Sequence, residues 1–178
     1  MNYLDTPTPD SFRAVEEGIE RVSRKVASCS RDDIILLRLV TYLARNYEEM
    51  ISRIIRPLRL NEVMFKTLLM AFGSPANEVN PSRLSTVTGE SRANMTRICD
   101  ELSQRGLIKR HASDSDRRRV VVSLTSAGER LVRNVLPRIG EKQRQVNAAL
   151  SSGEKQQLER LLKKQFGGLE AVLGHKER

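Results

Sequence analysis

The sequence has few aromatic residues, cysteines and histidines, and each shortage excludes a class of protein. Aromatic residues make up 4% of the chain and tryptophan is absent, so the core is expected to consist of aliphatic side chains and methionine, which suits packed helices. Cys29 and Cys99 stand far apart and provide neither a disulfide framework nor the paired spacing of a zinc site. Because His111 and His175 are isolated from other ligand-type residues, we expect no metal and no cofactor.

Long apolar runs and catalytic motifs are also missing. No segment approaches the roughly 18 apolar residues of a membrane span. The first ten residues, MNYLDTPTPD, lack the basic and apolar regions of a signal peptide. We therefore expect a cytoplasmic protein without a membrane partner. The sequence contains no glycine-rich phosphate loop, HExxH or G-x-S-x-G motif, so an enzyme is not expected.

Positive charge is abundant. The formal net charge is +9 over 178 residues, with 39% hydrophobic and 30% charged residues. These proportions are typical of a globular protein rather than a disordered chain. A basic balance favours polyanionic partners, so the position of the charges along the chain has to identify the partner.

Apolar residues at helical spacing predict helices at the N-terminal end. Residues 1–9 are expected to form a flexible arm, and a first helix begins at Asp10. Its apolar positions step by four and three residues: Val15, Ile19, Val22 and Val26. A longer helix runs from Asp32 to Arg56, with apolar residues on more than one side, and a third runs from Asn61 to Phe72. We assign residues 10–57 to N-terminal helices that contribute to dimerisation and a pocket.

Two further helices are predicted at the C-terminal end, over residues 126–173. The first starts at Thr125 and extends to about Leu150, with Pro137 and Gly140 expected to kink it. Ser152 is expected to cap the last helix, whose apolar residues share one face: Leu158, Leu161, Leu162, Phe166, Leu169 and Val172. Apolar faces at both ends of the chain need a partner, and a two-fold homodimer built from the first and last helices would cover them.

The central residues 58–125 contain a pair of short helices. Asn80 followed by Pro81 is a typical helix start, and the short helix is expected to turn Leu84 and Val87 inward. After a tight connection, Ser91 caps a second helix that ends near Gln104. This length and connection are typical of a helix-turn-helix.

The second helix has two different faces. Its inner face carries Met95, Ile98, Cys99 and Leu102. Its outer face carries Arg97 and small or polar side chains, which suit contact with base edges in a major groove. An ordinary amphipathic helix with a solvated face would look similar, so this helix alone does not decide between the two.

A basic hairpin follows and favours DNA. Strands are predicted over residues 107–111 and 120–124, with alternate residues from Val120 on one face. From Arg105 to Arg119 there are six Lys/Arg and two Asp. Three consecutive arginines repel one another in an isolated hairpin, whereas next to DNA they would bind phosphates or enter a narrow minor groove. An RNA-binding protein is less favoured, because this region has no aromatic residue for base stacking.

These motifs resemble a known family. The run SDSDRRRVVVSLTSAGERL is similar to the D-x-R…V-x-L-T-x-x-G wing signature of MarR-type regulators, and PSRLSTVTGESRANMTRICDELSQRGLIKR is similar to their two-helix reader. The resemblance covers about residues 35–170. The segments SRANMTRICDEL and NVLPR and the extra N-terminal helix are similar to the EmrR/MprA multidrug-efflux repressor branch of that family.

The resemblance implies a mainly helical winged helix-turn-helix protein with a small β-hairpin wing, a helical dimerisation region, and double-stranded DNA as its partner. It implies that Arg118 probes the minor groove while Asp116 orients it. The residues expected to contact DNA are Ser91, Arg92, Ala93, Asn94, Thr96, Arg97, Arg110, Asp116, Arg117, Arg118 and Arg119.

The resemblance also implies a repressor that occupies a promoter palindrome and is released by a small phenolic or lipophilic acid. The candidate effector-binding residues are Tyr42, Arg45, Asn46, Met64, Phe65 and Leu68, although the last three could equally be core. Two alternatives stay open: a redox-responsive regulator that uses Cys99, and an architectural DNA-binding protein without a ligand.

Overall fold

The computed structural model describes residues 9–26, 28–112 and 120–174. They form a mainly helical protein with one three-stranded antiparallel sheet, which confirms the predicted fold class. The chain divides into two compact units, Met1–Phe65 and Lys66–Arg178. Among the described residues, no helix combines the length and the apolarity needed to cross a bilayer.

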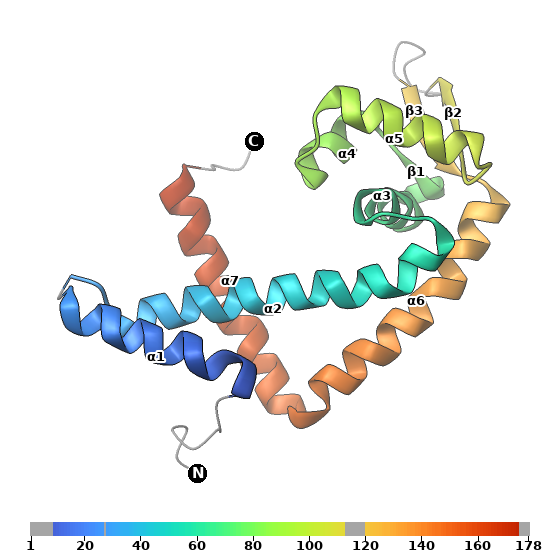
Figure 1. Cartoon of the computed structure of the whole chain (residues 1–178). Coiled ribbons are helices and arrows are strands. Elements are labelled where there is room, and N and C mark those ends of the chain that lie inside the picture. Colours follow the sequence, from blue (N-terminus) through green and yellow to red (C-terminus); the bar gives the residue numbers. More distant parts are fainter. Residues whose placement is uncertain (1–8, 27, 113–119, 175–178) are drawn as a thin grey trace. The chain divides into compact units, whose positions relative to one another are not determined.

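The first unit is built on two helices, α1 (Asp10–Lys25) and α2 (Arg31–Ile55), which lie side by side (Figure 1). Both lie where the apolar spacing predicted helices. The Phe12 ring meets the Tyr42 ring edge-on, with 5.6 Å between centroids. Arg31 joins the helices at the other end, since its Nη2 lies 2.8 Å from Glu16 Oε1.

Apolar residues of the first unit are only partly covered. On α1, Phe12 and Ile19 are buried, whereas Val22 is 48% exposed. On α2, only Ile54 and Ile55 at the C-terminal end are buried. The first half of α2 exposes a set of large apolar side chains: Leu36, Leu37, Leu39, Val40 and Leu43. The apolar residues predicted on more than one side of α2 are therefore mostly exposed in this unit.

The chain continues through a 3-10 turn, Arg56–Leu58, into α3 (Glu62–Phe72), which crosses from the first unit into the second. Asn61 caps α3 as predicted: its Oδ1 accepts a hydrogen bond of 2.8 Å from the Met64 amide. A second 3-10 turn, Pro75–Asn77, leads to the central elements of the second unit.

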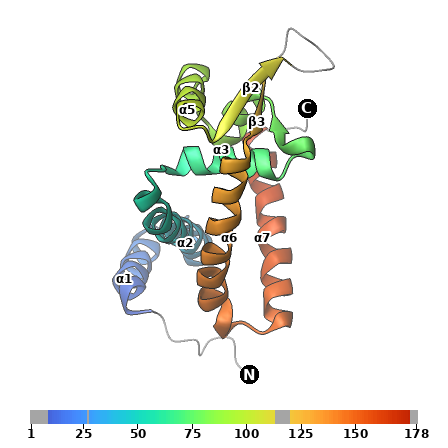
Figure 2. The ribbon, with the colours of Figure 1, turned by 90° about the vertical axis from the view of Figure 1, so that its right-hand side faces the viewer.

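The central elements are β1 (Glu78–Val79), α4 (Pro81–Thr88), α5 (Arg92–Gln104), β2 (Ile108–Ala112) and β3 (Val120–Leu124). The sheet order is β1-β3-β2, and all pairing is antiparallel. Two of the strands confirm the predicted hairpin. β1 was not predicted, because two residues show no periodicity. Figure 2 shows α5 beside β2.

The prediction of a buried position was wrong for one residue of α4. Leu84 is fully buried as expected, but Val87 is 63% exposed. The inner side of this short helix passes through Leu84 and the half-buried Thr88, whose Oγ1 donates a hydrogen bond of 2.7 Å to the Leu84 carbonyl. The buried side of α4 continues from Leu84 to Thr88, four residues later, and not to Val87, three residues later, so Val87 faces solvent.

The L-T-x-x-G part of the wing signature has a structural role in this chain. Thr125 caps α6 (Ser126–Val146) by accepting a hydrogen bond from the Gly128 amide, and its Oγ1 donates to the Gly106 carbonyl at 2.6 Å. A Cβ atom added at Gly128 would lie 2.1 Å from the Leu107 carbonyl oxygen. Glycine therefore lets α6 approach the start of the hairpin closely.

The last helix, α7 (Ser152–Leu173), follows a 3-10 turn at Asn147–Ala149 and buries none of its residues. Its cap corrects the prediction of Ser152. Ser151 is the N-cap residue, because Glu154 stands three positions after it and the two exchange reciprocal hydrogen bonds in a capping box. α6 contains Pro137 but continues as one helix to Val146.

Candidate nucleic-acid interface

The helix α5 separates its apolar and polar residues as the sequence predicted. Met95, Ile98, Cys99 and Leu102 are at most 1% exposed. Arg92, Ala93, Thr96 and Arg97 are exposed and lie on the other side, while Asn94 is half-buried. The buried face fixes the helix in its unit, so the exposed face has a defined direction.

The start of α5 is tightly formed. Gly89 ends α4 with a positive φ of 74°, a conformation that glycine adopts without strain. The Ser91 hydroxyl accepts a hydrogen bond of 3.2 Å from the Asn94 amide. Predicted as both a cap and a DNA contact, Ser91 caps the helix and remains exposed. The first turn of α5 presents exposed side chains, and in a recognition helix this N-terminal part is the part that meets base edges.

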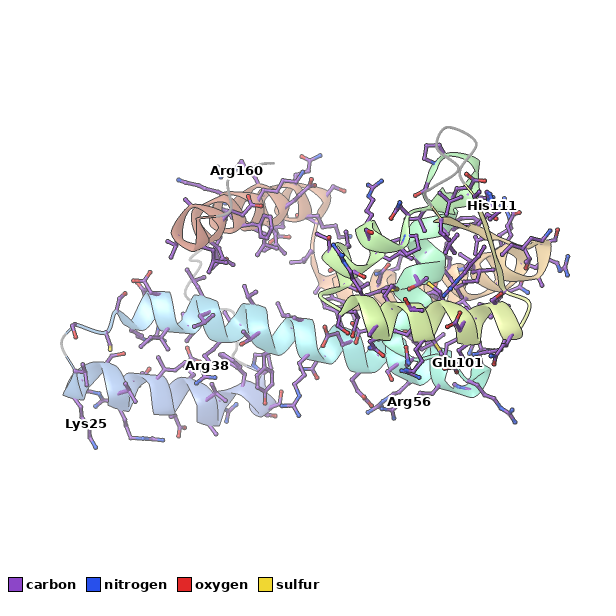
Figure 3. The ribbon with its side chains drawn as sticks, turned by 90° about the horizontal axis from the view of Figure 1, so that it is seen from above. Lys25, Arg38, Arg56, Glu101, His111 and Arg160 are labelled. Atoms are coloured by element: carbon purple, nitrogen blue, oxygen red, sulfur yellow. The ribbon has the colours of Figure 1, made fainter. Side chains whose placement is uncertain are left out.

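A chain of polar contacts holds Arg97. Glu90 accepts a hydrogen bond of 2.6 Å from Asn94 Nδ2, which orients the amide so that Asn94 Oδ1 faces Arg97. Arg97 donates to that oxygen from Nε at 3.2 Å and from Nη2 at 3.1 Å. Its Nη1 lies 3.6 Å from Glu101, labelled on α5 in Figure 3. Sequence reasoning found Asn94 and Arg97 but missed the two glutamates, which only the helical neighbourhood connects to them.

Arg110, a predicted DNA contact, is engaged within the protein. Its Nη2 donates a hydrogen bond of 2.8 Å to the Thr96 carbonyl and lies 2.9 Å from Asp100 Oδ1. The side chain is 32% exposed. Arg110 therefore ties strand β2 to helix α5. Asp100 was not among the predicted site residues, because only the folded chain brings it next to Arg110.

The other predicted wing residues lie outside the described part of the chain. They are Asp116, Arg117, Arg118 and Arg119. Their contacts stay predictions that rest on the resemblance.

Cys99 is a buried thiol. Burial raises the pKa of Cys99 above its usual range, because the loss of solvation outweighs the nearby Arg110 guanidinium. Since the thiolate is the reactive form, this environment disfavours oxidation or alkylation. His111 pairs with Glu78 at 3.1 Å, and the described residues contain no group of three or more metal-ligand side chains.

The six predicted effector residues fall into two groups. Tyr42, Arg45 and Asn46 line a cavity of about 680 Å³ in the first unit, which also includes Arg56, labelled in Figure 3. Met64 and Phe65 are 2% exposed, Leu68 is fully buried, and none of the three lines this cavity. The cavity wall is rich in charged residues, among them the ion pair of Arg53 and Glu49 at 2.9 Å.

The charged residues of this cavity wall differ in whether they form ion pairs. Arg53 lowers the pKa of Glu49 by hydrogen bonding to its carboxylate. Arg45, by contrast, forms no ion pair with any described residue. Arg45 is therefore a cation of this wall that is not already neutralised by a described carboxylate.

Comparison with known proteins places the chain in a family. Residues 60–120 match the MarR family. The chain is 33% identical over 162 residues to the transcriptional repressor MprA of Escherichia coli K12, covering 91% of this chain and 92% of the relative.

Solved structures agree with this match. AbsC, a MarR family transcriptional regulator from Streptomyces coelicolor, superposes with a TM-score of 0.70 at 20% identity, over 80% of this chain and 97% of AbsC. A cysteine-to-serine mutant of E. coli MarR, complexed with operator DNA, has a TM-score of 0.63 at 26% identity, over 75% of this chain and 94% of the mutant. Regulators of this family are not enzymes. The chain, with its capped reader helix beside a basic hairpin, belongs to the MarR family of transcriptional regulators.

Proposed function

We propose that this regulator is a homodimer that represses transcription by binding a pseudo-palindromic promoter site, with α5 in the major groove and the hairpin tip at the minor groove. The observation that carries the proposal is the exposed face of α5, where Arg97 is held ready beside Ala93 and Thr96. The name of the MprA relative, a transcriptional repressor, and the MarR structure with operator DNA support it.

The contacts on α5 support different roles for Arg97 and Asn94. A guanidinium fork suits the O6 and N7 atoms of guanine, and Arg97 is the exposed arginine that two neighbours already orient. Both polar atoms of the Asn94 amide are occupied by Glu90 and Arg97. Asn94 therefore acts mainly by holding Arg97, while Ala93 permits close approach of the backbone to DNA.

The hairpin adds the electrostatic part. Arg117, Arg118 and Arg119 would bind phosphates or enter the minor groove, with Arg118 as the probe and Asp116 as its orienting partner. Arg110 contributes indirectly, because its bonds to Asp100 and the Thr96 carbonyl fix the hairpin relative to the reader helix. Phosphate contacts of the hairpin are the same for every DNA sequence. Sequence specificity therefore depends on the base contacts that we propose for α5.

The test is fluorescence anisotropy with the DNA upstream of the protein's own coding sequence and a scrambled duplex as competitor. We expect specific binding that weakens ~10³-fold or more between 50 and 200 mM salt, if six or more phosphates are neutralised per dimer. Arg97→Ala should reduce specific affinity about 5- to 150-fold, the effect of ~1–3 kcal/mol for one bidentate base contact. Arg160→Ala on α7 is the matched control. Equal binding to the scrambled duplex would contradict the proposal.

Release by a small phenolic or lipophilic acid is the second part of the proposal. The cavity lined by Tyr42, Arg45 and Asn46 supports it, because Arg45 has no ion-pair partner among the described residues and can therefore bind the carboxylate of a ligand. Salicylate added to the protein–DNA complex should lower the anisotropy, and Arg45→Gln should weaken that response. If no acid releases the DNA, the proposed effector class would be rejected, while the proposed DNA binding by α5 would stand.

The redox alternative that uses Cys99 has a separate test. Thiol labelling at pH 8 should modify Cys29, which is half-exposed, much faster than the fully buried Cys99. Rapid labelling of Cys99 in the folded protein, with loss of DNA binding, would favour the redox alternative instead.

A further inference from the structure

His111 connects the hairpin strand β2 to the opposite edge of the sheet. Its Nε2 lies 3.1 Å from Glu78 Oε1 on β1, and its Nδ1 lies 3.0 Å from the carbonyl oxygen of Ala112, the last residue of β2. Because β3 is the central strand, the contact with Glu78 joins the two outer strands of the sheet. His111 is labelled beside the hairpin in Figure 3.

Both contacts of His111 require a hydrogen on the ring nitrogen. The oxygens of a carboxylate and of a backbone carbonyl only accept hydrogen bonds. A neutral imidazole carries a hydrogen on one of its two nitrogens, so its other nitrogen would face an acceptor without one. The doubly protonated imidazolium can donate to both oxygens at once, and its charge is opposite to that of Glu78. The geometry around His111 therefore fits the protonated ring.

Glu78 is the carboxylate that faces this imidazolium. By register, Glu78 and Lys109 both lie beside Ser123 of β3, on the same face of the sheet as His111. The described strand β3 and the 3-10 turn before β1 contain no charged residue. Lys109 adds a like charge two positions from His111. Among the described residues of this face, the imidazolium therefore depends on Glu78 for a partner.

The other face of β2 is attached in a different way. Arg110 precedes His111 and points to the opposite face, where Asp100 and the Thr96 carbonyl of α5 bind its guanidinium. Arginine stays charged at neutral pH, whereas histidine changes its charge between about pH 5 and 8. In this range the attachment of β2 to α5 is therefore constant, and its attachment to β1 depends on pH.

We propose that protonated His111, held by Glu78, positions the hairpin for DNA, so that DNA binding weakens as the pH rises through the range in which histidine loses its proton. The inference rests on the proposed DNA binding, in which the arginines that follow Ala112 in the sequence contact DNA. The chain enters that arginine-containing segment from Ala112, whose carbonyl the protonated ring binds. Loss of the proton removes one of the two contacts of His111 and holds this end of β2 less firmly.

The test is fluorescence anisotropy at about pH 6 and pH 8, at one salt concentration, with the DNA upstream of the protein's own coding sequence. We expect an affinity about two- to fivefold higher at the lower pH, the effect of a partly exposed ion pair. His111→Gln should remove this response, because an amide does not titrate. His175→Gln, which changes the other histidine of the sequence, should keep it.

Two outcomes of this test contradict the inference and are distinguishable. A protein that binds this DNA specifically, with the same affinity at both pH values, would overturn the role of His111 alone. Absence of specific binding at both pH values would overturn the proposed function and this inference with it.

Glu78→Gln separates positioning from direct contact of His111 with DNA. If Glu78 holds the imidazolium, this variant should lose most of the pH response. If His111 bound a phosphate instead, removal of the competing carboxylate would preserve or increase the response, and the inference would fail. Arg110→Ala is the comparison, because it should lower the affinity at both pH values without changing their ratio. The side chains of His111 and Glu78 are 37% and 38% exposed, so circular dichroism should show folded variants.

Discussion

The helices α5 and α7 have similar sequence patterns and opposite surroundings. Both carry apolar residues at helical spacing and both begin with a serine cap. α5 buries four residues almost completely, whereas α7 buries none, although it carries Leu158, Leu161, Leu162, Phe166 and Leu169. The difference shows that periodicity identifies the apolar face of a helix but does not tell what covers it.

The different surroundings of the two helices fit different proposed roles. Contacts with α4 and β2 cover the inner face of α5, so the helix is held in its unit and leaves its outer face exposed for the DNA contact that we propose. The described chain provides no cover for the apolar face of α7. An exposed apolar face of this size indicates an intermolecular contact, and the exposed apolar residues in the first half of α2 point the same way. Both support the proposed homodimer.

The largest expected effect comes from the covered helix. Leu102→Ala in α5 should lower the free energy of unfolding by about 2–5 kcal/mol, the usual range for a buried leucine. Chemical denaturation at one fixed protein concentration measures it, with the exposed Gln104→Ala as the control. A loss below ~1 kcal/mol would mean that α5 is not held in its unit as its burial indicates.

A substitution on the exposed apolar face of α7 should weaken dimerisation rather than folding. Leu162→Glu places a charge on the apolar face of α7, and burying an unpaired charge in an interface costs several kcal/mol. Sedimentation velocity should show a monomer at concentrations where the unmodified protein is a dimer. The control is Lys164→Glu, elsewhere on α7. A Leu162→Glu variant that stays dimeric would show that α7 is not the interface.

The link between α5 and β2 should have a moderate effect. Arg110→Ala removes the contacts with Asp100 and the Thr96 carbonyl. We expect DNA affinity to fall about fivefold to tenfold, the equivalent of ~1–1.4 kcal/mol, because these contacts only position the hairpin. Arg110→Lys should restore part of this. If Arg110 only positions the hairpin, the slope of affinity against salt should not change; a slope reduced by about one would make Arg110 a phosphate contact.

The smallest effect concerns the cap of α7. Hydrogen bonds from Ser151 lower the pKa of Glu154 below its usual range. Because the folded pKa is the lower one, the cap contributes above the unfolded pKa, and its contribution is lost as the pH falls through the folded pKa. Circular dichroism should show a slight acid-induced loss of helix that Glu154→Gln makes independent of pH. An unchanged acid transition in that variant would assign it to other carboxylates.

Much of the fold followed from local pattern. The caps at Asn61, Asn80 and Ser91 were visible in sequence because a side-chain oxygen precedes an apolar periodic run, and each makes the expected hydrogen bond. The buried face of α5 was equally visible. Val87 was mispredicted because an eight-residue helix offers too few turns to separate a step of three from a step of four.

The candidate site was less predictable. Arg92 and Arg97 could be placed on an exposed helix face, but the roles of Glu90 and Asp100 depend on neighbours that meet only in the folded chain. The same is true of the effector candidates. Met64, Phe65 and Leu68 have the composition of either a pocket or a core, and burial alone distinguishes the two.

The sequence by itself determined the helix positions, the reader and hairpin motif, and the family, because these depend on residue periodicity, caps and turn chemistry that act over a few positions. Tertiary structure decided which charged side chains are free. Arg110 is engaged by Asp100, whereas Arg38 and Arg45 have no ion-pair partner among the described residues. Charge pairing depends on a few ångströms between residues that are distant along the chain, and no local pattern encodes that distance.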